Sequence, residues 1–422
     1  MIRSVPLVFN DPAYHDPKDA EHLCLPYTVA PCPNSQRRFA GRLHAVPRLD
    51  LSTYEFRAVF DWIEISVETK RDRSSVNLYN RLRKLNEDFG AFRTCFVASP
   101  TRGSAHSGRG HVIKMQDPAP GGLPGLLRAF LREDCAPGCA LDDIPVTGME
   151  LSLDVYPAPR FCEGDYAVRR MLMTELLRKH VAVAVAEVFR EDRRHPRFVH
   201  KVYKTGSNTT TQRVVAPRGA AKHRVKKRAP EIGLRPLDIA SCDPAHHHQP
   251  FVDATLYFGQ KGERLSYRLM DKITDNRKGD MADDLSCHRT RSRAEFTLID
   301  ETPGDGLGPA SVGISSINDL ALDGLASFNT LLGFELPTFR RDASDPEIPD
   351  RDAWEIFAKT GVAGLAQRED ALDVMEGDRD TLRARARQRV QSSGKLLRFS
   401  NLNARATKAL RRLEKRWRRD WL

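Results

Sequence analysis

The chain has 422 residues and a formal net charge of +11, with 67 Lys or Arg against 56 Asp or Glu. This length allows two or three domains with a sizeable core. The sequence has no apolar stretch close to the ~18–20 residues that span a bilayer, and its first residues lack the long apolar centre of a signal peptide. The eight cysteines are scattered, so we expect reduced thiols in a cytoplasmic protein without a membrane partner.

The positive charge is concentrated in two segments. Residues 379–421 carry fifteen Lys or Arg against three acids, and residues 213–228 carry seven Lys or Arg and no acid. Basic segments on a body that is otherwise close to neutral favour contact with a nucleic-acid backbone, and the alternative is a solubilising tail. The predicted nucleic-acid contacts are Arg213, Arg218, Lys222, Arg224, Lys226, Lys227, Arg228, Arg268, Arg411, Arg412, Lys415 and Arg416.

Residues 1–55 are rich in Pro, His and Asp with little periodicity, so we expect an irregular N-terminal arm. Beyond the arm, several short runs have the composition or alternation of β-strands. The predicted strands are residues 60–67, 92–98, 111–115, 147–156, 198–204, 255–258, 265–272 and 293–298. Apolar residues at helical spacing predict helices at residues 76–89, 123–131, 165–190, 317–332 and 353–365, and amphipathic fragments within 379–422.

This mixture, without a regular alternation of strand and helix, predicts an α+β fold in which antiparallel sheets are covered by helices. A basic helical region follows at the C-terminus. The predicted division is an N-terminal arm (residues 1–55), a core (56–300), a helical extension (301–378) and a basic helical tail (379–422).

The strand at 147–156 places Glu150, Ser152, Asp154 and Tyr156 on one face of a sheet. Its two acids lie about 13 Å apart on a regular strand, so they cannot share one metal ion. Each can still join other groups on the sheet face. The alternative is a polar face that is simply exposed to water.

The strands at 265–272 and 293–298 place a tyrosine, an aspartate, a lysine and a glutamate on neighbouring extended segments. Carboxylates that hold a divalent metal beside a tyrosine hydroxyl can cut a phosphodiester by forming a phosphotyrosine. The four residues are Tyr267, Asp271, Lys272 and Glu295. An antiparallel sheet whose polar residues face water is again the alternative.

The order and spacing of three motifs resemble a known family. They are TLYFG at residues 255–259, RLMDK at 268–272 and RAEFTL at 293–298. Together they resemble the replication-initiation proteins of rolling-circle plasmids and filamentous phages outside the His-hydrophobic-His group, often called the Rep_trans family. Asp61-Trp62, QDP at 116–118 and ELSLD at 150–154 are similar to features of proteobacterial relatives. The resemblance covers roughly residues 58–300, the predicted core.

The resemblance implies a DNA replication-initiation protein that binds a plasmid or phage origin and nicks one strand through a tyrosine. Glu150, Asp154 and Glu295 are then the candidates to hold Mg²⁺ or Mn²⁺. Lys272, beside Asp271, stabilises charge on the phosphate or the leaving oxygen. The implied partners are origin DNA and the host replication machinery, and a homodimer is left open.

The chain departs from the family at the nucleophile, because Met270 occupies the position of the family's tyrosine. We favour Tyr267, which a strand bulge could turn toward Lys272. Tyr257 or Tyr203 is the alternative nucleophile. Two other classes of function also stay open: a non-enzymatic, sequence-specific DNA-binding protein on the same fold, and an RNA-binding or structural protein whose tail is the only functional part.

Overall fold

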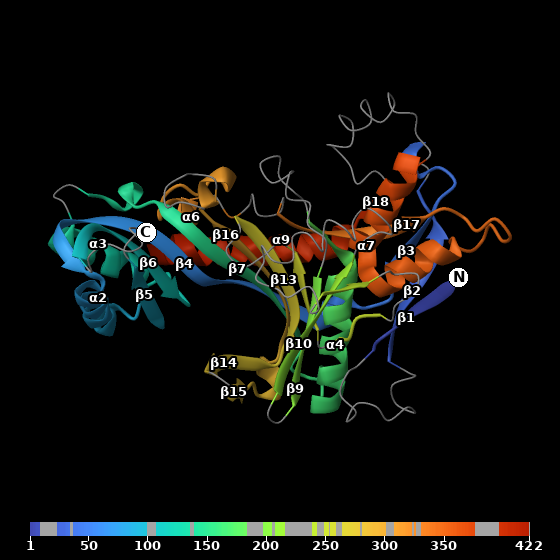
Figure 1. The fold of residues 1–422 in the computed structure, drawn as a ribbon, viewed down its shortest axis with the longest axis horizontal. Helices are drawn as coiled ribbons and strands as arrows, with labels where there is room; N and C mark the ends of the chain where they lie inside the picture. The colour runs from blue at the N-terminus through green and yellow to red at the C-terminus, as the bar shows by residue number, and fades with distance from the viewer. Residues whose placement is uncertain are drawn as a thin grey trace.

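A computed structural model of the chain gives the fold shown in Figure 1. The structure describes residues 1–8, 23–33, 37–98, 107–135, 139–183, 197–204, 207–215, 239–242, 249–252, 254–258, 264–278, 281–300, 308–322, 325, 331–375 and 396–421.

The main sheet has ten strands, and its neighbouring strands run antiparallel except for one parallel pair at the edge. The longest strand, β4, reaches across the molecule toward the end that carries helices α2 and α3 (Figure 1). In spatial order the strands are β11 (Ile239–Cys242), β10 (Ser207–Val215), β9 (Arg197–Lys204), β12 (Thr255–Phe258), β13 (Leu265–Lys272), β16 (Arg291–Ile299), β7 (Val146–Pro157), β4 (Tyr54–Ser74), β6 (Ser107–Gln116) and β5 (Thr94–Ala98).

The five central strands of this sheet correspond to runs in which the sequence predicted extended structure. Strands β12, β13, β16, β7 and β4 are consecutive neighbours, and the segments at 265–272 and 293–298 pair along their whole length. The predicted α+β class with antiparallel sheets is therefore confirmed. A separate two-stranded hairpin, β14 (Thr274–Lys278) and β15 (Met281–Asp284), follows β13.

A second sheet forms at the end of the molecule that carries the N-terminus (Figure 1). The prediction of an irregular arm is wrong for the described part of residues 1–55, because three strands of this second sheet lie there. Alternate burial of Leu25, Tyr27 and Val29 drives strand formation. The strands are β1 (Ile2–Pro6), β2 (Cys24–Pro31), β3 (Leu43–Pro47), β17 (Leu332–Phe339) and β18 (Leu396–Arg398), and β8 (Val181–Val183) pairs with β17.

The helices in the described residues begin and end close to sequence signals. Helix α2 starts after the N-cap Ser74 and ends at Gly90 with φ +57°, as predicted. Helix α4 is shorter than the predicted 165–190, because the chain enters β8 directly after His180. No helix in these ranges is long and apolar enough to cross a membrane. The helices are α2 (Ser75–Phe89), α3 (Leu123–Asp134), α4 (Glu163–His180), α6 (Asp319–Leu322), α7 (Arg351–Met375) and α9 (Ser400–Trp421).

Helices α4 and α9 cover the same face of the main sheet. Phe60, which pairs with Leu151 of β7, packs its ring 5.1 Å from the ring of Trp417 on α9. Ser292, which pairs with Val155 of β7, accepts a hydrogen bond from Thr174 on α4. Since alternate residues of β7 share a face, both helices lie on its apolar side. The polar residues of β7 therefore occupy the opposite face.

Candidate metal and strand-cleavage site

A row of polar side chains crosses the face of the main sheet that α4 and α9 leave uncovered. The antiparallel register sets Glu150 beside Thr297, Ser152 beside Glu295 and Asp154 beside Arg293. Cross-strand pairs share a face and lie within side-chain reach. The predicted acids of β7 and β16 therefore belong to one surface.

A further acid, Asp61, lies on this surface at a β-bulge. In β4, Phe60 pairs with Leu151 but Trp62 pairs with Glu150, so Asp61 is the extra residue. Its carboxylate accepts a hydrogen bond from Ser152. Asp61 shares this face with Val59 by plain alternation, and the bulge after it returns Ile63 to the apolar face beside Met149.

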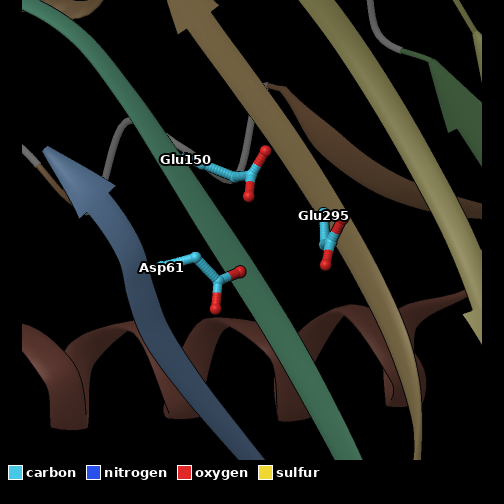
Figure 2. A group of neighbouring side chains, drawn as sticks. All are labelled: Asp61, Glu150 and Glu295. Carbon is cyan, nitrogen blue, oxygen red and sulfur yellow. The ribbon is translucent and has the colours of Figure 1, made fainter. Parts of the chain in front are cut away.

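Asp61, Glu150 and Glu295 form what we call the carboxylate triad (Figure 2). Each offers one carboxylate oxygen, and these oxygens all lie within 4.8 Å of one another. Mg²⁺ and Mn²⁺ prefer oxygen ligands, and Mg²⁺ binds them at about 2.0–2.1 Å. The donor set and its spacing therefore suit a divalent cation after a small contraction.

Two arginines contact the triad without completing its hydrogen bonds. Arg268 lies 3.0 Å from Glu150 and 2.5 Å from Glu295 Oε2, and Arg293 lies 2.9 Å from Asp61 and 3.3 Å from Glu295 Oε1. The Arg268 Nε–Glu295 Oε2 contact is an ion pair without hydrogen-bond geometry, so Oε2 is buried with no hydrogen-bond partner. Oε2 therefore meets a positive charge but no aligned hydrogen bond, as does Glu175 Oε2 beside Arg178 on α4.

The pKa values of Glu295 and Asp61 are both raised. Burial raises the pKa of Glu295 to about 7, and the nearby charge of Glu150 adds to this, while Arg268 and Arg293 act against it. Burial also raises the pKa of Asp61, although Arg293 and the hydrogen bond from Ser152 oppose the shift. A cation at the triad would favour the ionised form of both acids.

Asp154, predicted as a metal ligand, is instead enclosed by arginines. Arg293 donates to both of its oxygens at 2.5 and 2.7 Å, and Arg291 lies 2.9 Å away. Its carboxylate is therefore occupied, and Asp61 takes the place beside Glu150 and Glu295 that the sequence pattern had assigned to Asp154. The signal for Asp61 was present: Trp62 and Ile63 are adjacent apolar residues that interrupt the alternation of the strand.

Tyr267, the favoured nucleophile, lies on the wrong face. Its side chain is 2% exposed, and its hydroxyl donates a 2.8 Å hydrogen bond to Leu331 O. Burial raises its pKa far above the ordinary value. The pairing of β13 with β16 is regular throughout, so the bulge that was expected to re-aim this tyrosine is absent.

The other two predicted catalytic residues are also placed away from the triad. Asp271 shares the helix-covered face with Tyr267 and pairs with Arg170 of α4 at 2.6 Å. Lys272 lies on the polar face, but its ammonium is 3.5 Å from Asp275, at the start of the hairpin. Register places Lys272 beside Arg291 rather than beside Glu295.

Tyr257 is the tyrosine that the register aligns with the triad. It pairs with Arg268, which pairs with Glu295, so the three residues form one row across β12, β13 and β16. The Cα atoms of Tyr257 and Glu295 are then separated by two strand spacings, about 9–10 Å. Burial lowers the pKa of Arg268, but the charges of Glu295 and Glu150 and the Tyr257 phenol raise it by more.

The predicted nucleic-acid contacts fall in three places. Arg268 belongs to the site itself. Arg411, Arg412, Lys415 and Arg416 are exposed on α9, whose apolar residues are buried. The remaining six residues and the side chain of Arg213 lie outside the described part of the structure: Arg218, Lys222, Arg224, Lys226, Lys227 and Arg228.

Comparison with known proteins adds no assignment, because no protein-family model, no curated protein and no solved structure matches the chain.

Proposed function

We propose that the chain is a DNA replication-initiation protein that binds a plasmid or phage origin and cuts one strand through a tyrosine. The observation that supports this most is the convergence of Asp61, Glu150 and Glu295, of which Glu295 lies in the same row as Tyr257. The order of the sequence motifs supplies the substrate class.

In this proposal Tyr257 replaces Tyr267 as the nucleophile. A bond forms between Tyr257 Oη and phosphorus, and the bond between phosphorus and the deoxyribose oxygen breaks. The proton lost by the phenol is balanced by the proton gained by the leaving oxygen. Arg268 lies between the phenol and the triad, so its guanidinium can hold the phosphate and stabilise the phenolate.

Mg²⁺ or Mn²⁺ held by Asp61, Glu150 and Glu295 would supply a Lewis acid that offsets negative charge on the phosphate. The three residues fit such an ion by donor type and spacing. Arg293, two residues before Glu295 on β16, would keep Asp61 and Glu295 in place.

The test is incubation of the full chain with supercoiled plasmid carrying its own replicon's origin, in the presence and absence of Mn²⁺. We expect a metal-dependent covalent protein–DNA adduct that is lost in Tyr257→Phe. Tyr267→Phe is the matched control, because it removes a hydroxyl from the same part of the sheet on the opposite face. An adduct that survives Tyr257→Phe and disappears in Tyr203→Phe or Tyr156→Phe would contradict the assignment of the nucleophile.

A non-enzymatic DNA-binding protein on this fold is the second candidate. Met270 occupies the family's tyrosine position, and Arg268 and Arg293 already neutralise part of the charge of the triad. Specific origin binding by the unaltered chain, with no adduct at any metal concentration, would support this candidate over the nickase.

A further inference from the structure

A cavity lies beside the triad on the same face of the main sheet, at the end of β7 and the start of β16. Its volume is about 280 Å³, near the lower end of the ~300–1,000 Å³ found for small-ligand sites. We call it the arginine pocket, after the residues that give it its chemistry. These are Arg57, Arg289 and Arg291, with the rings of Tyr156 and His288.

The arginine pocket is connected to the triad through Asp154. The Tyr156 hydroxyl donates to Asp154 Oδ2 at 3.4 Å, and Arg291 Nε lies 2.9 Å from the same oxygen. Asp154 is in turn held by Arg293, which contacts the triad. From Arg291 to Glu295 the distance along β16 is about 13 Å. Nucleotides a few positions apart on one strand can therefore occupy both places.

The pocket offers stacking surfaces together with positive charge. The Arg57 guanidinium lies 5.0 Å from the centre of the Tyr156 ring, and Arg291 lies 5.9 Å from it. The side chain of Arg57 is 57% exposed. Aromatic rings and guanidinium planes stack on nucleic-acid bases, and arginine also binds phosphate.

The acids of the pocket do not cancel its charge. Glu55 holds Arg57 through hydrogen bonds of 3.0 and 2.9 Å, and Asp275 lies 3.5 Å from Lys272. Three arginines against these two acids leave the lining net positive, and Lys272 adds a further cation at its margin. This combination favours a ligand with both a negative group and a flat ring.

We propose that the arginine pocket binds a nucleotide of single-stranded DNA a few positions from the phosphate that is cut. The choice of DNA as the ligand rests on the proposed function. The pocket gives the site a second point of attachment, which fixes where along a melted strand the scissile phosphate meets Tyr257.

Binding of fluorescein-labelled oligo-dT to the full chain, followed by anisotropy across a range of salt concentrations, tests this without any cleavage. Arg289→Gln removes an exposed cation, and we expect the log–log salt slope to fall by about 0.7 when one phosphate fewer of a single strand is neutralised. Tyr156→Leu removes the ring, and we expect roughly 5- to 100-fold weaker binding. Arg128→Gln, at an exposed position on α3, is the control and should bind as the unaltered chain does.

The proposal is overturned if Arg289→Gln and Tyr156→Leu both bind oligo-dT with unaltered affinity and slope. This outcome is separable from failure of the nickase. If the pocket variants weaken oligo-dT binding and the unaltered chain never forms an adduct, the pocket stands and the nickase fails. If adducts form and the pocket variants bind normally, the nickase stands and the pocket fails. Arg289→Gln is at the surface, so its result holds even where Tyr156→Leu reduces stability.

Discussion

Two buried glutamates, Glu175 of α4 and Glu295 of β16, have pKa values shifted in opposite directions. Burial raises the pKa of Glu175, but Lys179 at 2.8 Å and Arg178 at 3.6 Å outweigh it, and the result is a lowered pKa. At Glu295 burial prevails, and the pKa rises to about 7. Two buried glutamates thus differ in the direction of their pKa shift, because the balance of charge around them differs.

The two charge clusters differ in composition. One carboxylate faces two cations around Glu175, and the cluster ties α4 to other segments: Arg178 donates to Val252 O and Lys179 donates to Lys359 O. Around Glu295, four carboxylates face three arginines. The first arrangement is suited to holding the fold together. The second retains unbalanced negative charge, as sites that bind cations or perform chemistry do.

The largest expected effect is at the α4 cluster. Glu175→Gln leaves Lys179 and Arg178 buried without their carboxylate, and we expect a loss of about 3–5 kcal/mol in the free energy of unfolding. Urea denaturation measures it. The control is Glu55→Gln at an exposed ion pair, for which we expect a change within ~0.5 kcal/mol. A loss of stability no larger than that of Glu55→Gln would show that the α4 cluster does not hold the fold together.

His180, next to Lys179, makes the same region sensitive to acid. Its Nδ1 lies 2.7 Å from the Glu335 carbonyl and must donate, so its Nε2 accepts from the Tyr27 hydroxyl. Burial lowers the pKa of His180 from 6.5 to about 4. The unfolded chain therefore binds a proton first as pH falls below 6.5, and stability should decline between pH 6.5 and 4, by at most ~3 kcal/mol.

The measurement is the free energy of unfolding in urea at a series of pH values. His180→Asn removes the titrating group and should flatten the profile between pH 6.5 and 4. An equally steep decline in the variant and in the unaltered chain would assign the acid sensitivity to other groups.

Glu295→Gln should change the free energy of unfolding much less than Glu175→Gln does. Arg268 keeps Glu150 as a partner, and Arg293 keeps Asp61 and Asp154. Removal of one acid from a group in which acids outnumber arginines should leave the free energy of unfolding at neutral pH within ~1 kcal/mol. A loss comparable to that of Glu175→Gln, measured in the same urea experiment, would show that both clusters are structural.

The smallest expected effect concerns the exposed face of α9. The apolar side of this helix, including Leu413 and Trp417, is buried, so deletion of the tail would also remove part of the core. Replacement of exposed cations by Gln avoids this. The log–log salt slope of duplex DNA binding should become shallower by about 0.9 for each phosphate that the variant no longer neutralises. The residues to replace are Arg411, Arg412, Lys415 and Arg416.

An unchanged slope in the α9 variant, with unchanged thermal stability, would mean that duplex DNA does not contact this helix. The difference between the clusters around Glu175 and Glu295 would not depend on this result.

The sequence predicted the central strands because their apolar residues alternate, as in residues 149–155, and it predicted α2 because its leucines and Gly90 follow helical rules. The sequence prediction failed where pairing between distant strands decides the secondary structure. The strands of residues 1–55 form because they pair with one another and with β17. Helix α4 ends at His180 because Val181–Val183 pairs with β17. Such partners are distant in sequence, and the short alternation of Leu25, Tyr27 and Val29 does not by itself specify them.

The site was predictable in part. Glu150 and Glu295 could be assigned to one sheet face from alternation and motif order, and the structure brings them together. Asp61 stands at a bulge that shifts the alternation of β4, so counting back from Ile63 in a regular strand assigns it to the apolar face. Regular alternation also explains why Tyr267 faces away from the triad. Strand β13 has no bulge, and Tyr267 is three positions from Met270, so the two side chains lie on opposite faces.

The central claim is that the carboxylate triad, unlike the α4 cluster, binds a cation. Calorimetric titration of Mn²⁺ into the full chain and three variants tests it most directly. We expect binding in the unaltered chain that is lost in Asp61→Asn and Glu295→Gln and retained in Asp154→Asn, whose carboxylate is occupied by arginines. Mn²⁺ binding that is unaffected by Asp61→Asn and Glu295→Gln would contradict the account.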